Sequence, residues 1–132
     1  MILAMYKYLF LGLCFLACRK TSSYNAENPV TIKLAECTTV QRSADNVKVC
    51  VDSLNDSRCP LNATCIWAGY AAVKLTVSLK NETHSFMLST LSRSGFPPPD
   101  TTLANHRFQL VNVLPYPGET ANGTSRVELK ID

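Results

Sequence analysis

The sequence predicts an all-β fold: a single antiparallel β-sandwich or small barrel of about six to seven strands, stabilised by disulfides. Apolar and polar residues alternate with a period of two through most of the chain after residue 29, and no window has a convincing helical period. Polar turns separate the alternating stretches at short intervals, as in antiparallel β proteins. Four cysteines follow residue 18, and an even number is typical of small exported domains with disulfides.

Six stretches carry the alternation, and in each we expect one face to lie in the core. The predicted strands are residues 30–36, 46–51, 67–80, 83–89, 106–114 and 125–131. The side chains expected to point inward are Ile32, Leu34, Val47, Val49, Val51, Val73, Leu75, Val77, Leu79, Phe86, Leu88, Phe108, Leu110, Val113, Val127, Leu129 and Ile131. A triple proline at 97–99 cannot donate to a strand ladder, so it predicts a stiff, extended connection.

Residues 1–17 have the layout of a secretory signal peptide, with one basic residue, Lys7, before an apolar run. The run covers residues 8–17, whereas a membrane-spanning helix needs about 20 residues. The sequence Phe-Leu-Ala-Cys at 15–18 resembles a bacterial lipobox. This resemblance implies that Cys18 is acylated and becomes the first residue of the mature chain. The alternative is ordinary cleavage before an unmodified Cys18.

The expected organisation is a signal peptide at 1–17, a lipid-anchored tether at 18–29 and a β-domain at 30–132. The tether is polar, and Arg19 and Lys20 stand where some surface-exported bacterial lipoproteins have an acidic run. We therefore expect a protein of the bacterial cell envelope, an outer-membrane lipoprotein that faces the periplasm. Its expected partners are the membrane, through the lipid anchor, and a protein of the envelope.

The charge of the chain argues against nucleic acid as a partner. After loss of the signal peptide, 115 residues remain, with 12 basic and 10 acidic side chains and a formal charge of +2. No Lys/Arg cluster occurs, whereas nucleic-acid-binding domains carry a basic patch or stripe. The length corresponds to one domain with a modest core.

The four cysteines after Cys18 are expected to form two bridges, although three pairings are possible. Cys59 and Cys65 bracket the short loop PLNAT, which favours pairing them, and Cys37 with Cys50 then follows. The alternation places both Cys37 and Cys50 on outward strand faces, as a bridge between neighbouring strands requires. A zinc site is disfavoured because no CxxC pair occurs and the compartment is oxidising.

Two motifs carry a resemblance to a known family. One is the block DSRCP at 56–60, four residues and then CIWAG at 65–69; the other is VNVLPYP at 111–117. Together they resemble an uncharacterised family of small exported bacterial proteins, many of them lipoproteins. The resemblance implies a single β-rich domain in the cell envelope and implies no activity.

The same block has a physical interpretation. Its first two residues are turn formers, and Gly69 indicates a bulge or a close backbone approach. If the block is a contact surface, Arg58 is expected to be its charged tip. Trp67, expected to pack against the Cys59–Cys65 bridge, is the second candidate recognition residue. Phe96, next to the triple proline, is the third candidate recognition residue.

No catalytic, cofactor or metal site is predicted. The two histidines, His84 and His106, are expected to be strand-face residues, His84 on the same face as Phe86 and Leu88, and no GxSxG motif occurs. Asp52 and its neighbours lack the glycine and terminal glutamate of an EF-hand. We therefore expect an envelope-anchored, non-enzymatic β-domain with a binding or structural role. The alternatives are an inhibitor that presents a disulfide-pinned loop to a hydrolase, and, less favoured, a small hydrolase.

Overall fold

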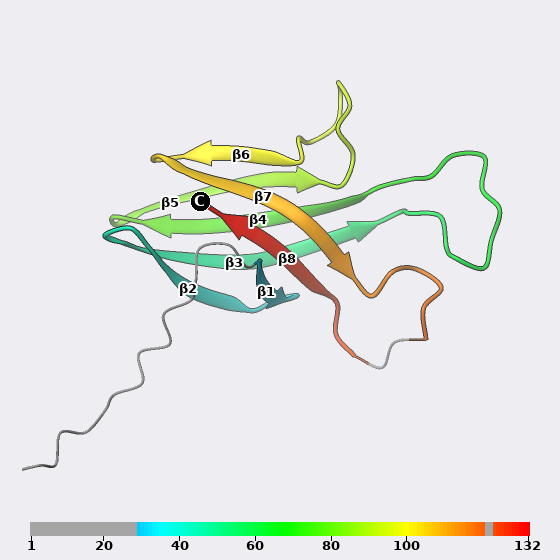
Figure 1. Cartoon of the computed structure of the whole chain (residues 1–132), viewed down its shortest axis with the longest axis horizontal. Coiled ribbons are helices and arrows are strands. Elements are labelled where there is room, and N and C mark those ends of the chain that lie inside the picture. Colours follow the sequence, from blue (N-terminus) through cyan, green and yellow to red (C-terminus); the bar gives the residue numbers. More distant parts are fainter. Residues whose placement is uncertain (1–28, 121–122) are drawn as a thin grey trace, which may run out of the picture.

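The computed structural model describes residues 29–120 and 123–132, so the signal peptide, Cys18 and nearly all of the tether lie outside the described residues. The described residues contain no helix and form eight strands in two antiparallel sheets of four (Figure 1). One sheet has the order β1-β8-β7-β6, formed by Val30–Lys33, Arg126–Ile131, His106–Leu114 and Asp100–Leu103. The other has the order β2-β3-β4-β5, formed by Cys37–Arg42, Asp45–Asp56, Ala71–Leu79 and Glu82–Ser89.

The apolar faces of the two sheets share one core, in a sandwich-like arrangement. Phe108, Leu75 and Leu88 are its largest fully buried side chains. Apart from Leu34 and Phe86, which are only partly buried against it, every side chain expected to point inward is buried. Period-two alternation therefore predicted the core correctly, because successive strand residues face opposite sides of a sheet.

Two strands were missed, and one expected strand is shorter. Residues 30–36 do not form one strand, because Ala35 adopts a φ of 64° and the chain crosses there from β1 to β2 in the other sheet. β2 escaped prediction because it buries only Val40 and Arg42. β6 is only four residues long and buries none of its side chains fully. Neither strand carries a hydrophobic alternation that the sequence could reveal.

Two other expected boundaries were wrong. β3 continues from 51 to 56 past a register shift between Val51 and Ser53, and such a bulge interrupts the alternation of faces. A second shift, between Leu110 and Asn112, explains why Val113 faces the core three residues after Leu110. Residues 67–70 belong to a loop, and β4 begins only at Ala71.

Both expected disulfides are present. Cys37 and Cys50 are directly opposite each other in β2 and β3, with a Cα–Cα distance of 4.0 Å. Cys59 and Cys65 close the short loop between β3 and β4, with a Cα–Cα distance of 5.9 Å. The first pairing was correct although Cys37 does not continue the strand at 30–33, because β2 presents it outward all the same.

The connections between strands give the domain two different ends. Three tight turns, at 43–44, 80–81 and 104–105, lie together at one end, which we call the hairpin end. The long connections 57–70 and 90–99, and the described parts 115–120 and 123–125 of the connection after β7, lie at the opposite end, which we call the loop end (Figure 1). The loop 57–70 extends well beyond the strands in this view. Because the sheets are antiparallel, alternate connections must gather at the same end.

Candidate recognition site at the loop end

The loop end is one joined surface built from three segments. The backbone N–H of Leu61 donates to the carbonyl of Pro117 at 3.0 Å, which ties loop 57–70 to the segment after β7. The ring centroids of Trp67 and Phe96 are 6.5 Å apart, which ties the same loop to the segment after β5. Tyr70 completes this aromatic group at 5.0 Å from Phe96. Two of the predicted recognition residues, Trp67 and Phe96, are therefore neighbours.

Arg58 is not a charged tip, and this expectation is corrected. Its side chain is buried, with a relative exposure of 8%, and its guanidinium forms hydrogen bonds within the domain. Nε and Nη2 donate to the two carboxylate oxygens of Asp56 at 2.8 and 2.6 Å. Nη2 also donates to the carbonyl of Val113 at 2.9 Å, and the guanidinium lies 4.4 Å from the ring centroid of Tyr116. Arg58 thus fastens the root of the loop to β7.

Gly69 fixes the other side of the loop by a close backbone approach. Its φ is 69°, and a Cβ placed on it would lie 1.8 Å from the carbonyl oxygen of Ser57. Around this contact, the N–H of Ser57 donates to the carbonyl of Tyr70 at 2.9 Å, and the N–H of Cys59 donates to that of Ala68 at 2.8 Å. The two segments that lead into and out of the loop, 57–59 and 68–70, are therefore joined by backbone hydrogen bonds as far as Cys59.

The apolar side chains of this loop are exposed. Ile66 has a relative exposure of 107%, Leu61 of 67% and Trp67 of 52%. Sequence reasoning singled out Trp67 but missed Ile66 and Leu61. Their positions in the sequence could have indicated this exposure. Leu61 lies inside the short disulfide ring and Ile66 immediately follows it, and so short a ring cannot enclose a core. A rigid loop that exposes three large apolar groups is suited to contact another molecule.

The histidines lie elsewhere and are not brought together. His106, buried at the start of β7, places Nε2 3.2 Å from Oδ2 of Asp45. His84, in the edge strand β5, pairs instead with Glu82 at 3.2 Å. Within 29–120 and 123–132, no group of three or more His, Cys, Asp or Glu side chains is placed to hold a metal ion.

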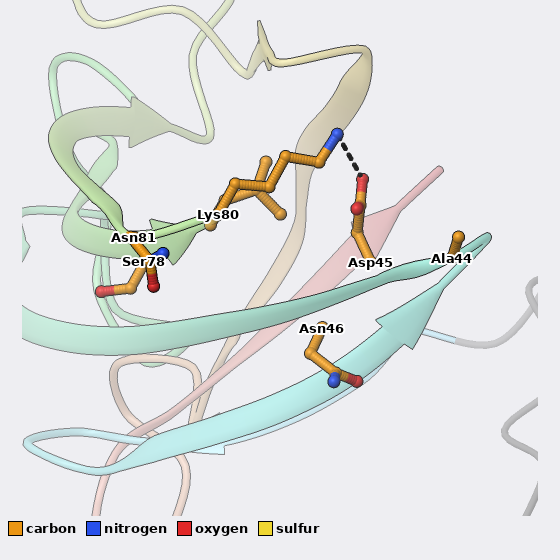
Figure 2. A pocket seen from close by; sticks show the side chains of 7 residues that line it. Ala44, Asp45, Asn46, Ser78, Lys80 and Asn81 are labelled. Atoms are coloured by element: carbon orange, nitrogen blue, oxygen red, sulfur yellow. Dashed lines mark ion pairs between the residues drawn. The ribbon is translucent and has the colours of Figure 1, made fainter.

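A shallow hollow of about 410 Å³ opens at the hairpin end, beside Asp45 (Figure 2). Lys80 reaches across it, with Nζ 3.3 Å from Oδ2 of Asp45. The hydrogen bond with His106 lowers the pKa of Asp45 most; partial burial opposes this, and Lys80 lowers it further. The residues that line the hollow are Ala44, Asp45, Asn46, Ser78, Leu79, Lys80 and Asn81.

No protein-family model, curated protein or solved structure matches this chain. The family resemblance of the DSRCP block therefore stays a prediction. In the part of the chain that the structure describes, no helix is long and apolar enough to cross a membrane.

Proposed function

We propose that this protein is an exported, envelope-anchored, non-enzymatic binding domain that contacts a protein partner through its loop end. One observation carries the proposal: Leu61, Ile66 and Trp67 are exposed together on a loop whose roots are fixed by Arg58 and Gly69. A preorganised loop loses little conformational entropy when it binds, so less of the free energy gained by burial is offset by ordering the loop.

The position of the N-terminal strand β1 supports an orientation in which the loop end points away from the membrane. Val30, the first residue of β1, pairs with Leu129 near the end of β8, whereas Lys33 pairs with Arg126 at the loop end. The chain therefore enters the domain from the side of the hairpin end. A lipid on Cys18 would attach the domain from that side, and the loop end would face away from the membrane.

The chemistry of the loop defines the partner surface. No charged residue occurs between Arg58 and Lys74, so recognition there is apolar and insensitive to salt. Burial of one Leu or Ile side chain contributes about 1.5–3 kcal/mol, and Trp is enriched among residues that dominate protein interfaces. We expect an apolar pocket on the partner that accepts Ile66 and Trp67.

Site-specific photo-crosslinking in the native envelope tests the proposal. A photoreactive phenylalanine analogue replaces Ile66 at the loop end or, as the matched control, exposed Asn81 at the hairpin end. A discrete protein adduct is expected from position 66 and not from position 81. Equal adducts from both positions, or none from position 66, contradict the proposal.

A second candidate function, inhibition of a hydrolase, is favoured by the outline of the loop. Loop 57–70 protrudes from the domain and is closed by the Cys59–Cys65 bridge, a shape that fits an active-site cleft (Figure 1). Inhibition assays with the hydrolase identified by crosslinking decide this point. Ile66→Ser would raise the inhibition constant by at least tenfold, and unchanged inhibition would exclude the loop as the inhibitory element.

We further propose that the sheets form an open β-sandwich. In support, each sheet has its own pair of edge strands, β1 and β6 in one and β2 and β5 in the other. This architecture leaves the loop end free of a central opening and makes it a continuous outer surface.

A further inference from the structure

The two disulfides sit in different surroundings. Cys37 and Cys50 are partners in a strand ladder, which holds them together independently of the covalent bond. Cys59 and Cys65 lie in irregular chain. Each bridge has one exposed and one partly buried cysteine, so the difference between the bridges lies in the backbone that holds them. We propose that Cys59–Cys65 is a redox-active disulfide, opened by a dithiol reductant of the CxxC type through attack on Cys65 while the rest of the domain stays folded.

The first argument is that hydrogen-bond acceptors already lie next to the sulfur that reduction would release. Sγ of Cys59 lies 3.7 Å from the carbonyl oxygen of Pro60 and 3.6 Å from that of Ala63. In the disulfide this sulfur has no proton to donate. Once the bridge opens, the two sulfurs must separate beyond bonding distance, and the Cys59 thiol then has these carbonyl oxygens nearby as acceptors.

The second argument is that the frame of the loop does not depend on the bridge. The Ser57–Tyr70 and Cys59–Ala68 backbone hydrogen bonds lie on the strand side of it. The bridge spans six positions of sequence, against 13 for Cys37–Cys50. In the chain-entropy treatment, the shorter ring stabilises the folded state less. Opening it therefore releases the tip of the loop and leaves the sheets intact.

The chemistry is thiol–disulfide exchange. A thiolate of the reductant attacks Sγ of Cys65, forms a mixed disulfide there and displaces Cys59, which takes up a proton. The second thiol of the reductant then attacks the reductant sulfur that is bonded to Cys65, which releases the Cys65 thiolate. Two electrons pass to the protein, and the reductant leaves as a disulfide.

The consequence for binding rests on the proposed function. Ile66 directly follows the ring, so reduction loosens the backbone that presents it. Leu61, inside the ring, stays tied to Pro117 through its backbone N–H. The oxidised protein would then be the form that binds its partner, and the reduced protein the weak one.

The experiment follows both bridges in the same molecule. The exported protein is incubated with dithiothreitol, free thiols are alkylated at intervals, and labelled peptides are quantified by mass spectrometry. Cys59 and Cys65 are expected to be labelled at least tenfold faster than Cys37 and Cys50, with an unchanged far-ultraviolet circular dichroism spectrum. Glutathione in place of dithiothreitol should leave its trapped adduct on Cys65.

Opening of Cys37–Cys50 first or equally fast, loss of the β spectrum together with the Cys59–Cys65 bridge, or an adduct mainly on Cys59 would overturn the proposal. A Cys37→Ser/Cys50→Ser variant that folds should open the remaining bridge at the same rate within twofold, and a larger change would also count against it. These measurements involve no partner, so they can succeed when the crosslinking experiment fails, and the reverse.

Discussion

Two glycines in loops at the loop end show how local geometry separates a replaceable residue from an essential one. Gly69 and Gly95 both adopt positive φ, at 69° and 87°. A Cβ on Gly69 would meet the backbone of Ser57, whereas a Cβ on Gly95 would meet nothing within 4 Å. Both substitutions impose the left-handed conformation on an alanine, but only one also forces two chain segments apart.

Gly69→Ala is therefore expected to lower the free energy of unfolding by more than about 3 kcal/mol, and Gly95→Ala by about 1 kcal/mol. Urea unfolding of both variants at neutral pH measures the difference. Equal losses in the two variants would mean that the close approach of Gly69 to Ser57 does not contribute to the free energy of unfolding.

Arg58 acts on stability through its buried partners. Arg58→Ala leaves the Asp56 carboxylate and the Val113 carbonyl oxygen without their main donor, and we expect a loss of about 2–4 kcal/mol. The matched control is Lys33→Ala, which breaks an exposed pair of 3.8 Å with Glu36 and should cost less than about 0.5 kcal/mol. Chemical denaturation of the two variants checks this, and a near-neutral Arg58→Ala would contradict it.

At the scale of the elements, Asp45 connects strands of different sheets. It begins β3, forms one hydrogen bond with His106 at the start of β7, and pairs with Lys80 in the turn between β4 and β5. Arg58 joins the two sheets at the loop end through Val113. The contact of Asp45 with His106 joins them at the hairpin end. Its strength depends on the charge of the Asp45 carboxylate.

This contact predicts an acid-sensitive part of stability. The pKa of Asp45 is lowered below its ordinary value of 3.8, first by the hydrogen bond with His106, so folding favours the ionised carboxylate. The contribution is complete above the unfolded pKa and is lost as the pH falls through the folded pKa. Asp45→Asn should therefore flatten the fall in stability below pH of about 4.

Urea midpoints of the wild type and of Asp45→Asn between pH 6 and pH 3 test this expectation. Glu36→Gln, which removes only an exposed ion pair, serves as the control and should keep the acid dependence of the wild type. Parallel curves for the wild type and Asp45→Asn would show that the carboxylate is not linked to folding.

At the scale of the whole molecule, we propose that a lipid on Cys18 attaches the domain to the membrane and that the loop end contacts the partner. Cys18 lies outside the described residues. Its acylation would attach the domain to the membrane from the side of the hairpin end. Cys18→Ser should release the protein from membranes or block its processing, because the variant has no thiol at position 18 to carry the lipid. Membrane fractionation and the mass of the mature N-terminus measure both effects. Unchanged membrane association with normal cleavage would exclude the lipid anchor.

Much of the core could be predicted from sequence, and the candidate site only in part. Val47, Val49 and Val51 were placed correctly because alternation follows directly from strand geometry. The position of Arg58 could not be predicted, since its burial depends on Val113, 55 residues away. Phe96 was found through its neighbouring prolines, but its packing against Tyr70 joins two loops that only the fold brings together.

By itself, the sequence determined the all-β class, the alternating core and both cysteine pairs, because these follow from short-range periodicity and from proximity along the chain. Tertiary structure alone decided that β2 and β6 exist, since their few inward side chains are recognisable only beside their partner strands. It also decided that Arg58 supports the loop from inside while Ile66 stands fully exposed. Exposure is a property of how distant segments pack, and a buried guanidinium needs acceptors that the local sequence does not contain.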